Sequence, residues 1–199
     1  MTVENDTPPG QSHQPSSFRV FDKLYQAPLP ALDLFRKMRP GEQAPGEMWS
    51  DIGPWVLSGN QIWFASTFYN GEGISGVGAV GAFNLRARRY RMHYPPEIAA
   101  WSGSAMLLNA DNLWIGLVRH PEGADYGGGL LRYNTKTGAV TKYAISDVVH
   151  TIDRVGDGLY CGTSHGLYVV RGDQVTQSRF EPDAAGKFIM VEHAVRWRD

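Results

Sequence analysis

The sequence predicts an all-β protein: a β-propeller-like array of three to four blades, each a four-stranded antiparallel sheet. One observation is a repeat, because residues 112–143 read as strand, glycine-rich loop, strand, turn and strand, and related copies occupy 61–94 and 158–180. A second is the spacing of the copies, about 50 residues, which is typical of propeller blades. A third is composition, since 23 glycines and 12 prolines among β-branched and aromatic residues favour many short strands and turns.

The first 17 positions are polar and rich in proline, so residues 1–17 are predicted to be a disordered tail. The rest of the chain, 18–199, is predicted to be a single β-propeller-type domain. It opens with an alternation of apolar and polar residues at 18–25, which predicts a strand. Apolar residues at helical spacing over 31–39, followed by proline and glycine, predict a short N-terminal helix.

Three blades follow, at about 52–95, 101–146 and 148–183. Their strands are expected at 54–58, 61–68, 78–85 and 89–94; at 104–109, 112–119, 129–134 and 139–145; and at 149–155, 159–163, 166–171 and 174–180. Trp63, Trp114 and Tyr160 mark the second strand of successive copies and set the register between them. Phe83-Asn84 and Tyr133-Asn134 mark the end of the third strand in the first two copies.

Turn residues agree with this plan. Asp111-Asn112 and Asp157-Gly158 separate first and second strands, and Thr137-Gly138 and Gly172-Asp173 separate third and fourth strands. Such dipeptides tolerate the positive φ of a tight hairpin. The opposite connections are longer in the first two copies, at 68–78 and 119–129, and longer loops mark the face on which binding sites are expected.

Several motifs resemble the two-component regulator propeller repeat. They are LWIG at 113–116, GLLRYN at 129–134, TGAVTKY at 137–143 and LYCGTSHGLYVV at 159–170. The resemblance covers 112–181 well and 52–94 more weakly, and the chain departs from the pattern at Leu117, where a small hydroxyl residue is usual. It implies blades of a sensory ring and the sensing of a ligand or partner. A more distant likeness is to the virginiamycin B lyase type of propeller, without a matching His and Glu pair.

The number of blades leaves the closure of the ring open. Residues 187–199 read as one more innermost strand, and a partial blade from 18–25 and 187–199 is one solution. The chain as part of a larger parent propeller is a second, and two chains that close one ring as a homodimer are a third.

Composition excludes several classes of function. A formal net charge of −1 leaves no basic surface for nucleic acid, and no apolar run is long enough to cross a membrane. Cys161 is the only cysteine, so an internal disulfide and a cysteine-rich metal site are excluded. The N-terminus lacks a signal-peptide pattern, which predicts a cytoplasmic protein. No cofactor and no metal site are predicted.

Trp49 and Trp101 precede the first strands of two blades and are candidates for aromatic platforms at the mouth of the ring, although packing between blades is the commoner role of such residues. His120, Glu122 and Asp125 are residue types that ligate metals or transfer protons. The full set of candidate ligand-binding residues is Trp49, Tyr69, Glu72, Trp101, His120, Glu122, Asp125, Tyr126, His150 and His165.

No residue pattern identifies a reaction. His150 and His165 are expected near the same face, but a catalytic histidine needs a partner that fixes its tautomer, and the sequence shows none. The prediction is therefore a non-catalytic module that binds a small molecule or a protein, as a sensor or as part of a larger propeller. The alternative is a metal-assisted lyase or hydrolase that acts through the loop histidines, and a third reading is a structural fragment of an assembly.

Overall fold

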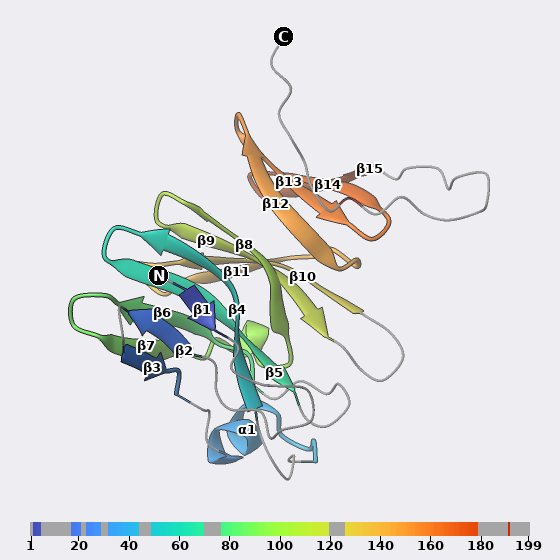
Figure 1. Ribbon diagram of the computed structural model, residues 1–199. Helices are drawn as coiled ribbons and strands as arrows, with labels where there is room; N and C mark the ends of the chain where they lie inside the picture. The colour runs from blue at the N-terminus through green and yellow to red at the C-terminus, as the bar shows by residue number, and fades with distance from the viewer. Residues whose placement is uncertain are drawn as a thin grey trace. The chain divides into compact units, whose positions relative to one another are not determined.

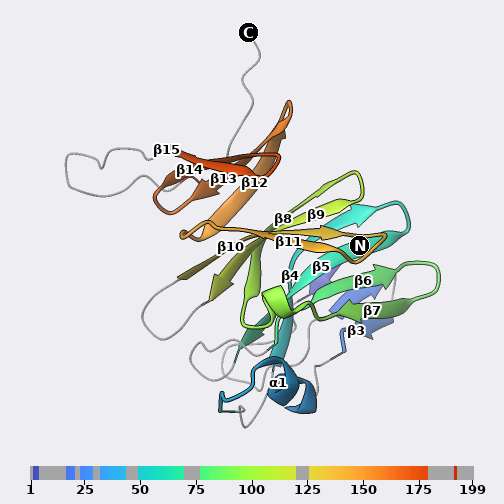
Figure 2. The same ribbon diagram turned by 180° about the vertical axis from the view of Figure 1, so that it is seen from behind.

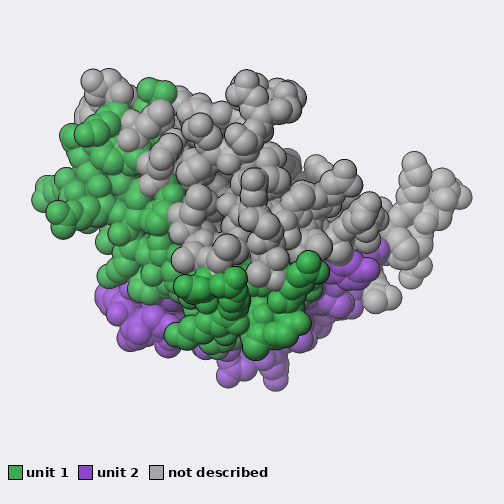
Figure 3. Space-filling view, turned by 90° about the horizontal axis from the view of Figure 1, so that it is seen from below, with its two compact units in different colours: residues 1–103, 119–124 green, residues 104–118, 125–199 purple. Residues whose placement is uncertain are grey.

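A computed structural model (Figure 1) gives the fold of the chain. It describes residues 2–4, 17–20, 23–28, 32–43, 49–69, 77–119, 126–178 and 191. The chain divides into two compact units, residues 1–103 with 119–124 and residues 104–118 with 125–199 (Figure 3). Each unit is described by itself, and the single domain expected over 18–199 stays a prediction.

Three four-stranded antiparallel sheets (Figure 1) confirm the all-β prediction, and the sequence repeat stays a prediction. The first contains β4 (Trp49–Ser58), β5 (Gln61–Tyr69), β6 (Val80–Asn84) and β7 (Arg89–His93). The second contains β8 (Ser102–Asn109), β9 (Asn112–Arg119), β10 (Tyr126–Asn134) and β11 (Val140–Tyr143). The third contains β12 (Val149–Val155), β13 (Gly158–Thr163), β14 (Gly166–Arg171) and β15 (Gln174–Ser178). In each sheet the strands are neighbours in chain order, and their arrangement about a common axis stays a prediction.

The N-terminal segment differs from the sequence prediction. The expected single strand at 18–25 is instead two antiparallel strands, β2 (Ser17–Val20) and β3 (Lys23–Gln26). A third strand, β1 (Thr2–Glu4), pairs with β2, so the prediction of a disordered tail is wrong for these residues. A strand has two edges, and β1 and β3 pair with the two edges of β2. The N-terminal segment therefore forms a three-stranded sheet of its own.

Little of the described chain is helical. The helix α1 spans Leu32–Met38, within the segment that has helical spacing of apolar residues, and a short 3₁₀ turn, η1, spans Pro96–Ile98. Phe35 is the buried residue of α1, and the guanidinium of the buried Arg39 lies 5.1 Å from the centre of its ring. Arg39 also donates a hydrogen bond to Glu42. This side-chain hydrogen bond is the main reason that the pKa of Glu42 is lowered.

The hairpin turns lie where they were predicted. In the turns between the first and second strands, however, the residue with positive φ directly precedes the predicted dipeptide. Ala110 (φ 51°) and Gly156 (φ 61°) take the left-handed conformation there. In the third-to-fourth-strand turns it is Arg88 (φ 53°), Gly138 (φ 74°) and Gly172 (φ 57°). A two-residue hairpin needs this conformation to match the twist of its strands, and glycine adopts it without the strain that alanine and arginine bear.

The repeated asparagine at the end of the third strand closes the next turn. The side-chain oxygen of Asn84 accepts hydrogen bonds from the backbone amides of Arg86 (3.0 Å) and Ala87 (2.7 Å). Asn134 does the same for Lys136 (3.1 Å) and Thr137 (2.9 Å). Backbone amides in a turn have no partner in the neighbouring strand, and the asparagine side chain supplies the acceptor for them. This role explains why the asparagine recurs in the sequence.

The aromatic residues that set the register of the repeat each lie beside an arginine. The guanidinium carbons of Arg91, Arg132 and Arg171 are 5.7 to 5.9 Å from the ring centres of Trp63, Trp114 and Tyr160, respectively. At this distance a cation is attracted to the face of an aromatic ring. The three rings are therefore structural in all three sheets.

A small residue on the second strand of each sheet allows another segment to approach closely. A Cβ atom built on Gly103 would lie 2.4 Å from that of Ala65, and one built on Gly116 would lie 2.8 Å from that of Val149. One built on Gly162 would lie 2.4 Å from the carbonyl oxygen of Val191. Val191 also donates its amide to Thr163. A close contact of this kind thus recurs in all three sheets. Ala65 meets the start of β8, Gly116 meets the start of β12, and Gly162 meets Val191.

The core of the first unit joins the three-stranded sheet to the sheet of β4 to β7. Figures 1 and 2 show β2 and β3 beside β6 and β7. Phe18 of β2 is fully buried, and its ring centre lies 5.6 Å from that of Phe64, 5.5 Å from that of Phe83 and 6.2 Å from that of Tyr90. Burial raises the pKa of Tyr90.

We expect Phe18→Ala to lower the free energy of unfolding of the first unit by about 3–5 kcal/mol, because it empties the centre of an aromatic cluster. Leu57→Ala is the matched control in the same unit, since Leu57 is 55% exposed. Its expected cost is below about 0.5 kcal/mol, and chemical denaturation of both variants measures the difference. Equal losses would show that β1 to β3 are not part of this core.

The core of the second unit contains Cys161, which is fully buried on β13 as the alternation of that strand predicted. Burial, with a smaller contribution from Asp153, raises the pKa of the thiol to about 12. A thiol reacts with alkylating reagents as the thiolate, which forms only as the pH approaches the pKa.

We therefore expect the native protein to react with iodoacetamide at pH 8 about a thousandfold more slowly than the same thiol in the unfolded chain. Mass spectrometry of the modified chain against time measures both rates. The rate should rise with pH through pH 9 and 10 without levelling off. A plateau near pH 9 would show that the thiol is not in a desolvated site.

Candidate functional site

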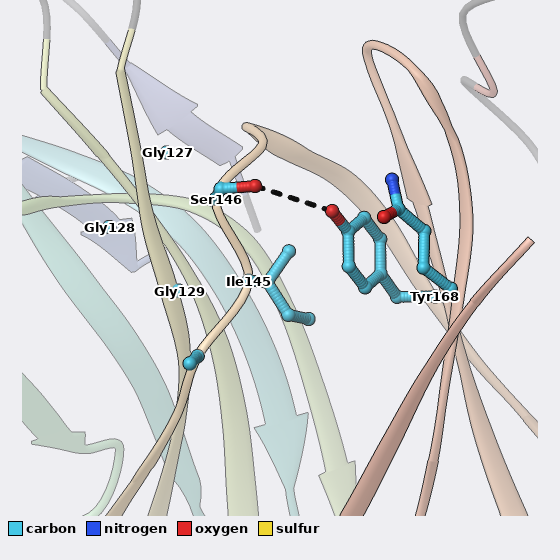
Figure 4. Close-up of a pocket in the computed structure, with 8 residues that line it drawn as sticks. Gly127, Gly128, Gly129, Ile145, Ser146 and Tyr168 are labelled. Atoms are coloured by element: carbon cyan, nitrogen blue, oxygen red, sulfur yellow. Dashed lines mark hydrogen bonds between the residues drawn. The ribbon is translucent and has the colours of Figure 1, made fainter. Parts of the chain in front are cut away.

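A pocket of about 470 Å³ lies in the second unit. Its walls are β10, the segment between β11 and β12, β14 and β15. The eight lining residues are Gly127, Gly128, Gly129, Ala144, Ile145, Ser146, Tyr168 and Gln177, and none of them is charged. Figure 4 shows Ile145 and Ser146 on one wall and Tyr168 opposite them.

Glycine on β10 lets the next segment of the chain run directly against this strand. A Cβ atom on Gly127 would lie 2.0 Å from the carbonyl oxygen of Asp147, and one on Gly129 would lie 2.5 Å from that of Tyr143. Gly129 also has a φ of 95°. Any larger residue would displace the backbone of 143–147, which carries Ile145 and Ser146 into the pocket. The glycine run therefore fixes one wall of the pocket.

Two hydroxyl groups meet across the pocket. The oxygen atoms of Ser146 and Tyr168 are 3.4 Å apart (Figure 4). The Tyr168 hydroxyl also donates to Oδ2 of Asp147 at 3.5 Å. Since the single hydroxyl proton of Tyr168 is directed at the carboxylate, Ser146 is the donor in the bond between the two hydroxyls. The lone pairs of Ser146 then remain as acceptors on the pocket wall.

Like Trp114 of the same unit, Gln177 has a buried side-chain nitrogen, in its case Nε2, without a hydrogen-bond partner among the described residues. Its neighbours Thr176 and Ser178 on β15 are exposed, as expected of an outer strand. A buried donor without an acceptor costs about 1–3 kcal/mol, and most buried polar groups in folded proteins are paired. Gln177 is thus a donor for which the described chain supplies no acceptor.

Asp147 connects the pocket to one of the predicted histidines. Its Oδ1 lies 2.6 Å from Nδ1 of His165, and its side chain is 13% exposed against 47% for the histidine. This contact fixes the tautomer with hydrogen on Nδ1 and gives His165 a partner that no sequence pattern showed. Thr163 lies 3.4 Å from the same carboxylate and donates at 2.9 Å to the carbonyl of Gly166.

The other predicted candidates are placed elsewhere. His150 at the start of β12 forms a hydrogen bond of 2.9 Å through Nε2 with the hydroxyl of Ser164. Trp101 is half-buried in the first unit, and its amide donates at 2.9 Å to the carbonyl of Ile98. Trp49 and Tyr69 are paired residues of β4 and β5. Tyr126 is 56% exposed at the start of β10.

Four candidates, Glu72, His120, Glu122 and Asp125, lie outside the described residues. Among the residues that are described, no group of three or more His, Cys, Asp or Glu side chains is arranged to hold a metal ion. No helix in the described ranges is long and apolar enough to span a membrane.

The residues that form the pocket were mostly missed from the sequence. None of the six candidates that the structure describes lines the pocket; His165 is linked to it through Asp147 and Tyr168, and Tyr126 directly precedes the lining residue Gly127. One signal was present: in four antiparallel strands that follow one another in a sheet, the connections after the second and the fourth strand lie at the same end, and Asp147 and His165 lie in connections of these two kinds. Gln177 carried no signal, because an outer strand is ordinarily solvated.

Comparison with known proteins gives little beyond the fold class. No protein-family model and no curated protein matches the chain. A solved structure that it resembles is described as the extracellular domain of a one-component system from B. thetaiotaomicron. The match has 15% identity and a TM-score of 0.34, and it covers 70% of this chain and 23% of that chain. The resemblance to the propeller repeat is thus not confirmed by a family match, and what is shown is an all-β chain with a distant structural neighbour.

The neighbour is an extracellular domain, which contradicts the cytoplasmic location predicted from the sequence, and that prediction is withdrawn. At this TM-score the likeness carries no argument for another location.

We expect Asp147→Asn to lower the free energy of unfolding of the second unit by about 1–2 kcal/mol, because it removes the charged acceptor shared by His165 and Tyr168. Urea denaturation measures the loss. Asp157→Asn is the control: that side chain is 88% exposed and lies 3.6 Å from Nε of Arg171. A surface pair of this kind is worth at most about 0.5–1 kcal/mol, so equal losses would contradict a structural role for Asp147.

Proposed function

We propose that the chain is a non-catalytic binding module and that the pocket of the second unit takes a small, neutral, polar ligand. The observation that carries the proposal is the buried amide of Gln177, which lines the pocket and has no hydrogen-bond partner among the described residues. Because Nε2 is closed to solvent, we propose that the amide turns about its last side-chain bond, so that an acceptor on the ligand satisfies it. The volume of about 470 Å³ is in the range of sites for small molecules.

The chemistry of the lining favours binding over catalysis. Nucleophilic catalysis by serine requires a base within hydrogen-bond reach, and the hydrogen-bond partner of Ser146 on the pocket wall is the hydroxyl of Tyr168 rather than an imidazole. His165 is directed to Asp147 through Nδ1 and is not among the eight lining residues. Neutral hydroxyls, an amide and apolar groups are the usual lining of a recognition site.

We also infer that the three sheets are blades of a propeller-type array and that the role of the module is sensory. Each sheet follows the same strand order, and the same close contact at a small residue recurs at Ala65, Gly116 and Gly162. In the second unit one hydrophobic core contains residues of both sheets, including Trp114 and Tyr168. A crystal structure in which successive sheets share no common axis would contradict the array.

Gln177→Leu tests the binding role, because it should act in opposite directions on stability and on binding. Removing a buried donor without a partner is expected to raise the free energy of unfolding by about 1 kcal/mol. The same change should weaken ligand binding by about tenfold, since one hydrogen bond is lost. Gln174→Leu on the same strand is the control, because Gln174 is exposed and does not line the pocket.

Binding is measured by titrating the isotope-labelled protein with a panel of neutral small molecules and following its amide resonances by NMR. The expected result is a shift of the signals of Gly127 to Gly129 and of the Gln177 side chain. A panel that leaves all of these signals in place, or a Gln177→Leu variant that is less stable than the parent, would contradict the proposed function.

A further inference from the structure

We infer that the group recognised in this pocket is an amide, as in a peptide bond or a carboxamide. The inference rests on the proposed function and names the chemistry of its ligand. It follows from three features of the lining: the side-chain amide of Gln177, the direction of the hydroxyl bonds, and the absence of charge on the eight lining residues.

The first feature is the geometry of a carboxamide. Gln177 presents a donor and an acceptor that are held side by side in one plane. The ligand group that matches both at once is a second amide, whose carbonyl accepts from Nε2 while its N–H donates to Oε1. The match requires both atoms to face the ligand, which a turn about the last side-chain bond provides, since Nε2 is closed to solvent as it stands. An ester, an ether or a lone hydroxyl matches only one of them.

The second feature is the acceptor on the facing wall. Asp147 is an acceptor only, and it holds the protons of His165 and Tyr168. Ser146 consequently donates to Tyr168 at 3.4 Å and keeps its lone pairs for the ligand. A ligand with a further N–H group would find its acceptor there. The chain of hydrogen bonds from His165 through Asp147 to Tyr168 therefore sets the polarity of this wall.

The third feature is neutrality. A carboxylate ligand would meet no cationic group on the lining, and an ammonium ligand would meet no carboxylate on it. Asp147 is not among the lining residues, and its two carboxylate oxygens are engaged by His165 at 2.6 Å and by the Tyr168 hydroxyl at 3.5 Å. Burying an unpaired charge is far more costly than burying a neutral amide with its hydrogen bonds made. The ligand is thus expected to be a blocked peptide or another uncharged amide, and not a free amino acid.

The methyl group of Ala144 and the side chain of Ile145 add a small apolar surface beside these groups, and glycines at 127–129 add backbone. Ile145 is buried, so its position is fixed. A short aliphatic side chain on the ligand matches this surface. Acetyl-alanyl-alanine amide combines neutral amides with such side chains and serves as the probe.

The experiment compares this probe with its matched ester, in which oxygen replaces the N–H of the central peptide bond, and with the free acid form of the dipeptide. NMR titration of the full chain reports binding at Gly127 to Gly129. The amide is expected to bind about tenfold more tightly than the ester. The free acid form of the dipeptide is expected to bind more weakly than the ester. Gln177→Glu, which retains the shape of the side chain but has no N–H group when ionised, should lose about tenfold in affinity for the amide. Gln174→Glu should lose nothing.

The outcomes separate the two proposals. Equal affinity for amide and ester at the same signals, or tighter binding of the free dipeptide, would overturn the amide inference and leave the pocket as a binding site. Binding of another neutral molecule in the panel without binding of the amide would overturn it in the same way. If no molecule shifts these signals, the proposed function itself fails.

Discussion

The packing of this protein depends on close approach between backbones at positions where the side chain is small. Gly103 meets Ala65 in the first unit, and Gly116 meets Val149 in the second. Gly162 meets Val191 in the same way. A methyl group added at any of these glycines would lie 2.4 to 2.8 Å from a neighbouring atom, which is closer than van der Waals contact allows, and packed interiors accommodate little extra volume. The repeat of aromatic and small residues along the second strand is therefore a packing requirement.

The same constraint shapes the pocket. Because Gly127 lets the backbone of Asp147 run against β10, the residues just before Asp147 have little freedom to move. Ile145 is buried and Ser146 bonds to Tyr168, so one side of the segment is held by packing and the other by a hydrogen bond. Asp147 is held in turn by His165. A wall fixed from three sides changes little when a ligand binds, and preorganisation of this kind lowers the cost of binding.

The strands and their turns could be predicted from the sequence because both depend on local chemistry. Alternation of apolar residues places the strands, and the asparagines at 84 and 134 place two of the turns. The N-terminal hairpin was missed because no glycine or proline interrupts 18–25; the signals of a turn were weaker, a break in the alternation at Val20-Phe21 and the polar pair Asp22-Lys23. In the candidate site, His165 was identified but Asp147 was not. Their contact joins two connections of the chain, and no periodic pattern records such a pairing.

Gln177 shows why a site of this kind escapes sequence analysis. Its place on an outer strand favours a polar residue, so the sequence gives no reason to separate it from the exposed Gln174. The difference is that the Nε2 atom of Gln177 is buried and lacks a partner among the described residues. A globular domain is stable by only about 5–15 kcal/mol, and an unpaired buried donor removes a noticeable part of that. Valine or leucine would fill the same place without this cost, and an acceptor on the proposed ligand would offset it.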